Sequence, residues 1–165
     1  MSSKRTDMLL YGEDVFVGYR HYEMVDRKPL FPFGYGLIRP LGVQESQRAE
    51  VSRKDYHMTH WVTGTCSSKR DGSEVVQIYV SHENPRIIRP AKELKDFAKV
   101  FLKSGETKSV SVEMPLLEVT SYWDSYKNQW LSEKATYHAL VGASSDNIVG
   151  DAVFSTEKDV YWLGV

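Results

Sequence analysis

The chain has 165 residues, of which 41% are hydrophobic and 26% are charged, and its formal net charge at pH 7 is −1. These fractions are typical of a soluble globular domain and exclude a disordered or fibrous chain. The length suits one domain and is too short for a (β/α)₈ barrel, which needs roughly 250 residues. Because the charge is nearly balanced, the composition favours neither a nucleic acid nor an acidic membrane surface as a partner.

The sequence carries few signals for redox state or targeting. Cys66 is the single cysteine, which excludes an internal disulfide and a cysteine-rich metal site. The apolar patch at residues 8–11 is shorter than the hydrophobic region of a signal peptide. No apolar run approaches the roughly 20 residues of a membrane-spanning helix. We therefore expect the chain as written to be cytoplasmic.

Most of the sequence has the pattern of short β-strands. Residues 75–80 have the two-residue period of a strand whose two faces are both partly apolar, and a run over 109–114 with one polar and one apolar face ends at Pro115. Strands are expected over residues 75–80, 99–102, 109–114, 122–124, 129–131, 137–141 and 148–154. Turns separate them at intervals of about 8–12 residues, which predicts a β-sandwich of the immunoglobulin or fibronectin type III class.

Three regions depart from this rhythm. Residues 90–98 begin with proline and place apolar side chains at helical spacing, which predicts a short helix. Residues 38–57 are polar and mixed in charge, which is typical of a linker or an irregular segment. Residues 29–37 are rich in aromatic residues, glycine and proline, which favours an extended strap lying on a surface over a helix.

The sequence contains no motif of a metal or cofactor enzyme. His57 and His60 have a spacing that chelates metals on a helix, but residues three apart on a strand face opposite sides, so structural or solvated histidines are favoured. No zincin motif, phosphate-binding loop, dinucleotide-binding loop or nucleophile elbow occurs. We therefore predict no metal site and no cofactor.

Two groups of side chains are candidates for glycoside hydrolysis or sugar binding. Carboxylates that could pair for glycoside hydrolysis are Glu74, Glu83, Glu106, Asp124 and Glu133, although surface and turn positions are favoured for most of them. The aromatic residues Trp123, Tyr126 and Trp130 form a candidate site for sugar or interface contact. The alternative is that these rings fill the core of the sandwich, and the residue types favour that alternative.

Residues 74–148 contain several sequence motifs in a recognisable order. They include EVVQIYV at 74–80, RPAKELKDFAKVFLKSGE at 89–106 and SYWD at 121–124, followed by VGASS at 141–145. This order resembles the fibronectin type III-like domain at the C-terminal end of many β-glucosidases of glycoside hydrolase family 3. The resemblance implies the same sandwich fold.

The N-terminal part resembles the same family. VFVGYRHY at 15–22 and PLFPFGYGL at 29–37 are similar to the end of its α/β sandwich domain and the exit from that domain. The resemblance implies three parts, which are a remnant of that domain over residues 1–37, a linker or irregular segment over 38–57 and a fibronectin type III-like sandwich over 58–165. Residues 1–37 are expected to be loosely held, or to strap onto the sandwich through Phe31, Phe33 and Tyr35.

The family resemblance implies carbohydrate metabolism but not catalysis by this chain. The family hydrolyses β-linked glucose with retention, using an aspartate nucleophile and a glutamate acid/base on its other domains. No residue here matches either motif, so no catalytic residue is expected. The leading interpretation is a non-catalytic accessory fragment with the catalytic domains as its partner. The alternative is a free-standing module that binds glucan, oligosaccharide or protein.

Overall fold

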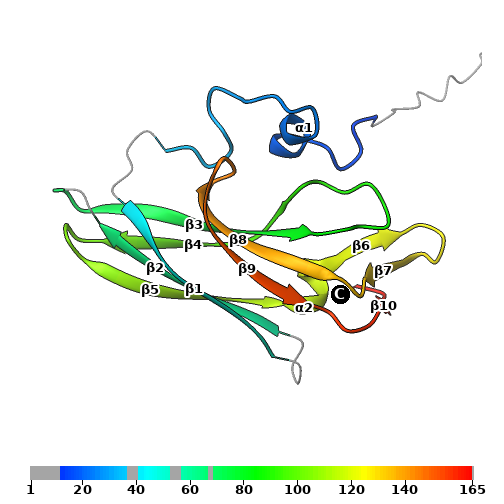
Figure 1. The fold of residues 1–165 in the computed structure, drawn as a ribbon. Coiled ribbons are helices and arrows are strands. Elements are labelled where there is room, and N and C mark those ends of the chain that lie inside the picture. The colour runs from blue at the N-terminus through cyan, green and yellow to red at the C-terminus, as the bar shows by residue number, and fades with distance from the viewer. Residues whose placement is uncertain (1–11, 37–40, 53–56, 67–68, 165) are drawn as a thin grey trace, which may run out of the picture.

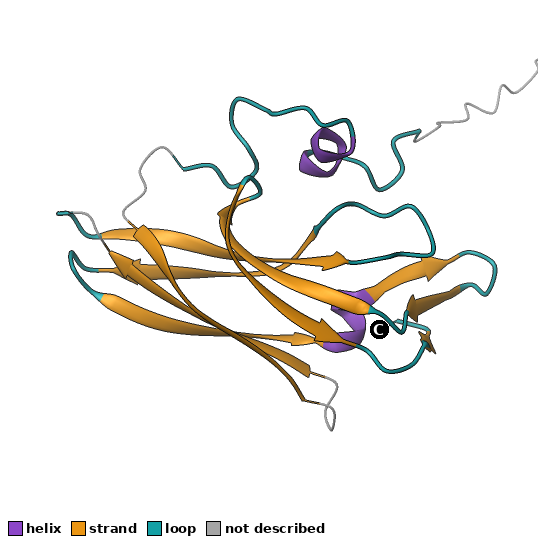
Figure 2. Ribbon diagram, viewed as in Figure 1, coloured by secondary structure: helices purple, strands orange, loops and turns teal. Residues whose placement is uncertain are grey.

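The computed structural model describes residues 12–36, 41–52, 57–66 and 69–164, and most of this backbone is extended (Figure 2). Its helices and strands are, in chain order, α1 (Tyr19–Met24), β1 (Leu41–Ser52), β2 (His57–Cys66), β3 (Gly72–His82), β4 (Glu93–Leu102), β5 (Thr107–Pro115), α2 (Leu116–Thr120), β6 (Ser121–Asp124), β7 (Gln129–Ser132), β8 (Thr136–Ser144), β9 (Asn147–Ser155) and β10 (Val160–Trp162). The predicted all-β class is confirmed. No helix within these ranges has the length and hydropathy needed to cross a bilayer.

The strands form two stacked layers (Figure 1). One layer has the strand order β4-β3-β8-β9 and the other has the order β1-β2-β5, with antiparallel pairing throughout. A small third sheet, β10-β7-β6, lies at one end of the sandwich. Residues 12–36, called here the N-terminal strap, carry α1 and cross the outer side of the four-stranded layer (Figure 1).

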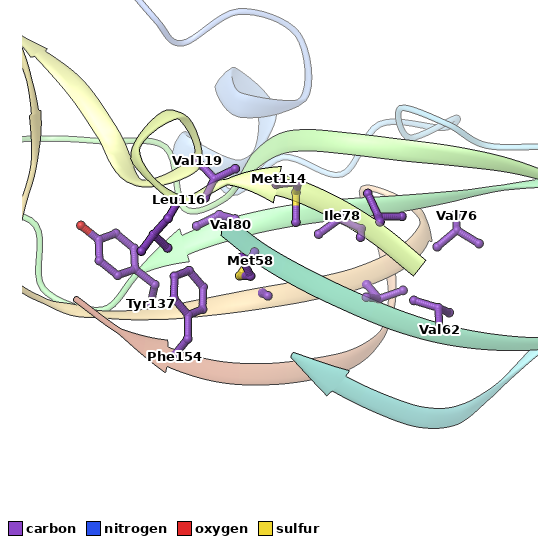
Figure 3. Packing of buried hydrophobic residues seen from close by; sticks show 13 residues of the cluster. Met58, Val62, Val76, Ile78, Val80, Met114, Leu116, Val119, Tyr137 and Phe154 are labelled. Atoms are coloured by element: carbon purple, nitrogen blue, oxygen red, sulfur yellow. The ribbon is translucent and has the colours of Figure 1, made fainter. Parts of the chain in front are cut away.

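The hydrophobic core lies between the two layers (Figure 3). Alternate residues of β3 point inward, and alternate residues of β8 meet them from the neighbouring strand. The side chains that fill this space from the two layers and α2 are Met58, Val62, Val76, Ile78, Val80, Val112, Met114, Leu116, Val119, Tyr137, Ala139, Val141 and Phe154. This alternation is the one that the sequence predicts for 75–80 and 137–141.

The N-terminal strap explains why both faces of β3 are partly apolar. Tyr79 points away from the core and is fully buried, because the ring of Tyr19 meets it edge-on at 5.8 Å. Tyr19 also accepts the backbone N–H of Leu94 at 2.8 Å, and the backbone oxygen of Phe33 accepts the N–H of Ser145 at 2.9 Å. These contacts fasten the strap to the sandwich, and an ion pair between Glu23 of α1 and Lys92 adds to them.

The helix predicted over residues 90–98 is wrong, because most of these residues form β4. Asp96 pairs with Ile78, whereas Leu94 pairs with Tyr79, so Lys95 is an extra residue at a β-bulge. A bulge shifts the alternation of side chains by one position. This shift places apolar residues at a spacing that imitates a helix.

The irregular segment predicted over residues 38–57 is also wrong for most of its length. Residues 41–52 form β1, which pairs with β2 from Leu41 opposite Cys66 to Ser52 opposite His57. The pairing shifts register between Val43 and Gln47, so no regular alternation marks the strand in the sequence. The sandwich therefore has a first strand that the sequence pattern does not reveal, whereas the division into domains stays a prediction.

Candidate binding groove

A groove with a volume of about 720 Å³ lies beside the third sheet, where three segments meet. These segments are the start of the N-terminal strap, the connection between β3 and β4, and the β6–β7 hairpin. The apolar side chains that line it are Val15, Ile87, Ile88, Trp123, Tyr126 and Trp130. A concave surface with this size and an aromatic lining is typical of a ligand site.

The two tryptophans of the hairpin stand directly opposite each other, because Trp123 of β6 pairs with Trp130 of β7. Their rings meet edge-on, with centroids 5.7 Å apart and planes at 77°. Trp130 also lies against Trp162 of β10, and the Trp162 indole is fixed by an Nε1–H···Oγ bond of 2.9 Å to Ser121. Trp123 remains 46% exposed and Trp130 37% exposed. The structure places both rings at the surface and outside the core cluster, so the core position that the residue types favoured is wrong for them.

The turn of the hairpin is held by hydrogen bonds between an aspartate side chain and the backbone. The Asp124 carboxylate accepts the backbone N–H groups of Tyr126 at 2.9 Å and Lys127 at 3.4 Å, as expected for an aspartate at a turn. Asn128 completes the turn with φ of 50°. Tyr126 at the tip is fully exposed, so the structure brings all three predicted aromatic residues to the edge of one groove.

The floor of the groove is a set of three charged side chains, in which two cations share one carboxylate. Glu93 accepts hydrogen bonds from Arg89 at 2.9 Å and from Lys95 at 3.0 Å. Burial raises the pKa of the Glu93 carboxyl, but the two cations lower it by more, so the pKa lies below its ordinary value. Burial lowers the pKa of Lys95 by more than Glu93 raises it.

Arg89 also joins the floor to the hairpin side of the groove. Its Nη1 donates to the backbone oxygen of Thr120 at 3.1 Å, and its guanidinium lies 5.5 Å from the centroid of the Tyr122 ring. The sequence did not reveal this set, because the predicted helix placed these residues in the wrong element.

A second charged cluster surrounds Glu133, which the sequence grouped with the other carboxylates. Its side chain is only 1% exposed, and its Oε1 lies 3.2 Å from Arg86 Nε and accepts the Tyr122 hydroxyl at 3.3 Å. Glu133 Oε2 lies 3.0 Å from Nε2 of the buried His82, but the two atoms are not aligned for a hydrogen bond. Burial and the Glu133 charge raise the pKa of Tyr122 to about 12.

Comparison with known proteins identifies part of the sandwich. Residues 74–145, which run from β3 to the end of β8, match the family described as fibronectin type III-like domain. These residues form a fibronectin type III-like domain. It contains the groove floor, the hairpin and the Glu133 cluster.

The similarity to whole proteins extends beyond this domain. A β-glucosidase from Kluyveromyces marxianus is 43% identical over 157 residues, which are 95% of this chain but 18% of that protein. The crystal structure of the K. marxianus β-glucosidase in complex with glucose superposes with a TM-score of 0.85, at 42% identity, over 94% of this chain and 18% of that chain. A family 3 β-glucosidase from Bifidobacterium adolescentis has a TM-score of 0.83 at 34% identity, covering 90% of this chain and 22% of that one.

These matches relate the chain to the C-terminal part of family 3 β-glucosidases, as the sequence phrases predicted. The chain spans about a fifth of the length of these relatives. Those proteins therefore contain long regions beyond the part that matches this chain.

Two of the other carboxylates that the sequence offered for catalysis instead bond to nearby backbone N–H groups. Glu106 accepts the backbone N–H of Lys103 at 2.8 Å in a turn, and the Glu74 carboxylate accepts the N–H of Val75 at 3.2 Å. The side chains of His57 and His60 lie outside the described residues. In the part of the chain that is described, no group of three or more histidine, cysteine, aspartate or glutamate side chains could hold a metal ion.

The outer side of the N-terminal strap is strongly apolar. Phe31 and Tyr35 pack on each other with ring centroids 5.4 Å apart, while Leu30 beside them is 92% exposed. Other large apolar side chains that remain exposed on the strap are Val15, Val17, Tyr22, Met24, Val25 and Phe33. So many large exposed apolar side chains on one short segment are unusual on a monomer.

Proposed function

We propose that the chain is a non-catalytic accessory module that packs against the catalytic part of a β-glucosidase-like glycoside hydrolase. The observation that carries this proposal is the apolar outer side of the N-terminal strap, because the strap itself is fastened to the sandwich while its large side chains stay exposed. The relatives supply the nature of the partner, since the proteins that match over 95% of this chain are named β-glucosidases and are about five times longer.

The first test is activity. We expect the purified chain to leave an aryl β-glucoside intact, because it has no counterpart of the nucleophile or acid/base motif of the family that it resembles. Measurable hydrolysis that survives extensive purification would contradict the proposal.

The second test is association in trans. The chain is mixed with a K. marxianus β-glucosidase from which the matching region has been removed, and binding and hydrolysis are both measured. We expect a complex and a gain in activity, both lost in the double variant Leu30→Asp/Phe31→Asp. Phe97→Asp is the matched control, because Phe97 is an equally exposed aromatic residue on β4 rather than on the strap. A chain that binds insoluble glucan but not the truncated enzyme would instead favour the free-standing binding module.

A further inference from the structure

We propose that the groove between the N-terminal strap, the β3–β4 connection and the β6–β7 hairpin binds a neutral oligosaccharide. The groove shares Val15 alone with the exposed apolar side chains named on the strap, so the proposal does not depend on the accessory role.

The first observation is that the aromatic rings are both exposed and held in place. Trp130 lies between Trp123 and Trp162, and Trp162 is hydrogen-bonded to Ser121. The tryptophans therefore lose little conformational freedom when a ligand arrives, which favours binding. Each ring presents an apolar face on which the C–H side of a pyranose can stack, and an indole N–H at its edge as a donor.

The second observation is the charge of the groove. The floor holds Glu93 between Arg89 and Lys95, and these side chains already satisfy one another. The other charged lining residues are Arg20 and the acidic Asp14, Glu118 and Asp124, so the whole lining carries three cations and four carboxylates and is close to neutral. An anionic or cationic ligand gains no net attraction from such a lining, whereas hydroxyl groups can both donate to carboxylate oxygens and accept from N–H groups.

The shape of the groove also favours a saccharide over a peptide. An extended peptide binds by adding a strand to a free sheet edge, or a helix binds by filling an apolar cleft. Here the walls are a loop, a hairpin and the strap, and apolar rings alternate with charged groups. A volume of about 720 Å³ lies within the range of small-molecule sites and suits a few sugar units.

Binding is tested with defined probes, the β-1,4-linked and β-1,3-linked glucose hexamers, by calorimetry and by tryptophan fluorescence on the full chain. We expect one of them to bind and to change the fluorescence. Trp123→Ala should weaken the affinity at least roughly tenfold, the size expected for the loss of one stacking ring. Trp123→Phe should restore part of it. Phe97→Ala, which removes an exposed ring outside the groove, should bind as the parent chain does.

A second variant guards against loss of folding. Because Tyr126 is fully exposed, Tyr126→Ala leaves the packing of the hairpin intact and should still reduce the affinity. The proposal is overturned if neither hexamer binds at millimolar concentration, or if Trp123→Ala and Phe97→Ala bind equally well. It is likewise overturned if only polypeptides occupy the groove in the same assay.

Discussion

At the scale of single residues, Gly34 controls how the N-terminal strap lies on the sheet. Its φ is +80°, and a Cβ added there would lie 2.1 Å from Nε2 of Gln77. Gln77 cannot move aside easily, because it is buried, donates to the Ala143 carbonyl at 3.0 Å and accepts the hydroxyl of Tyr79. The strap can therefore approach the sheet this closely only with glycine at position 34.

We expect Gly34→Ala to destabilise the strap contact by about 2 kcal/mol, combining backbone strain with overpacking. Hydrogen exchange of the Ser145 amide reports this directly, since that N–H donates to Phe33. It should exchange at least roughly tenfold faster in the variant. Gly105→Ala is the matched control, because Gly105 has φ of +76° but open space around it. Equal exchange rates in both variants would disprove the close-contact explanation.

Glu133 is the residue whose removal should affect the sandwich most. Glu133→Ala leaves the buried His82 without its carboxylate and removes one of the two carboxylates that Arg86 contacts. The loss is expected to come mainly from the buried His82 side of the cluster, because Arg86 is half exposed and keeps Asp159. Urea unfolding should show this loss. Glu113→Gln on the exposed side of β5 should change stability by less than about 0.5 kcal/mol. A Glu133→Ala variant as stable as this control would rule out a stabilising role for the cluster.

At the scale of elements, the β3–β4 connection is fastened to the third sheet by charged groups. Arg86 bridges Glu133, which follows β7, and Asp159, which precedes β10, with Nη1···Oδ2 at 2.8 Å. Asp159 also accepts the backbone N–H of Lys134 at 2.7 Å. These contacts hold one wall of the groove against the third sheet.

Stability should fall on mild acidification. Burial lowers the pKa of His82 more than Glu133 raises it, and the nearby Arg89 and Arg86 lower it further. The unfolded chain binds a proton as the pH falls below about 6.5, before the native His82 does, so unfolding becomes easier from there down to the lowered pKa. Urea midpoints between pH 7.5 and 5 should fall in the parent chain and less in His82→Gln. His138→Gln, at a partly exposed position outside this cluster, should keep the dependence of the parent. A flat parent profile would contradict this reasoning.

Elements with regular alternation could be predicted from the sequence, and elements with a broken alternation could not. The alternating apolar residues of β3 and β8 carry their own signal, because one face of each strand is buried whatever its neighbours are. The bulge at Lys95 and the register shift after Val43 exist only in the pairing with another strand, so no local pattern shows them. For the same reason the aromatic side of the groove was found from the sequence while its charged floor was missed.

At the scale of the whole molecule, the apolar side chains of the sandwich are buried between its layers, whereas those of the strap are exposed. The core is complete between the layers, yet Leu30, Phe31 and their neighbours on the strap have no cover in the described structure. About 25 cal/mol is gained for each Å² of apolar surface removed from water, so this face favours association.

We therefore expect the isolated chain to self-associate as its concentration rises. Sedimentation velocity should show a larger average mass at high concentration, because exposed strap residues of different copies meet. Leu30→Asp/Phe31→Asp should shift the chain toward the monomer, whereas Phe97→Asp should do so much less. A chain that stays monomeric at all concentrations would argue against the strap as an association surface.

The last residues of the described chain have a consequence for how the molecule tolerates trimming. β10 is only three residues long, yet it supplies Trp162 behind Trp130, and Gly164 lies so close to that indole that an added Cβ would be 3.1 Å from Nε1. Brief digestion with a carboxypeptidase would remove this support while leaving both layers of the sandwich untouched. The Trp130 ring would then lose its contact with Trp162. Removal of β10 should therefore alter the aromatic side of the groove.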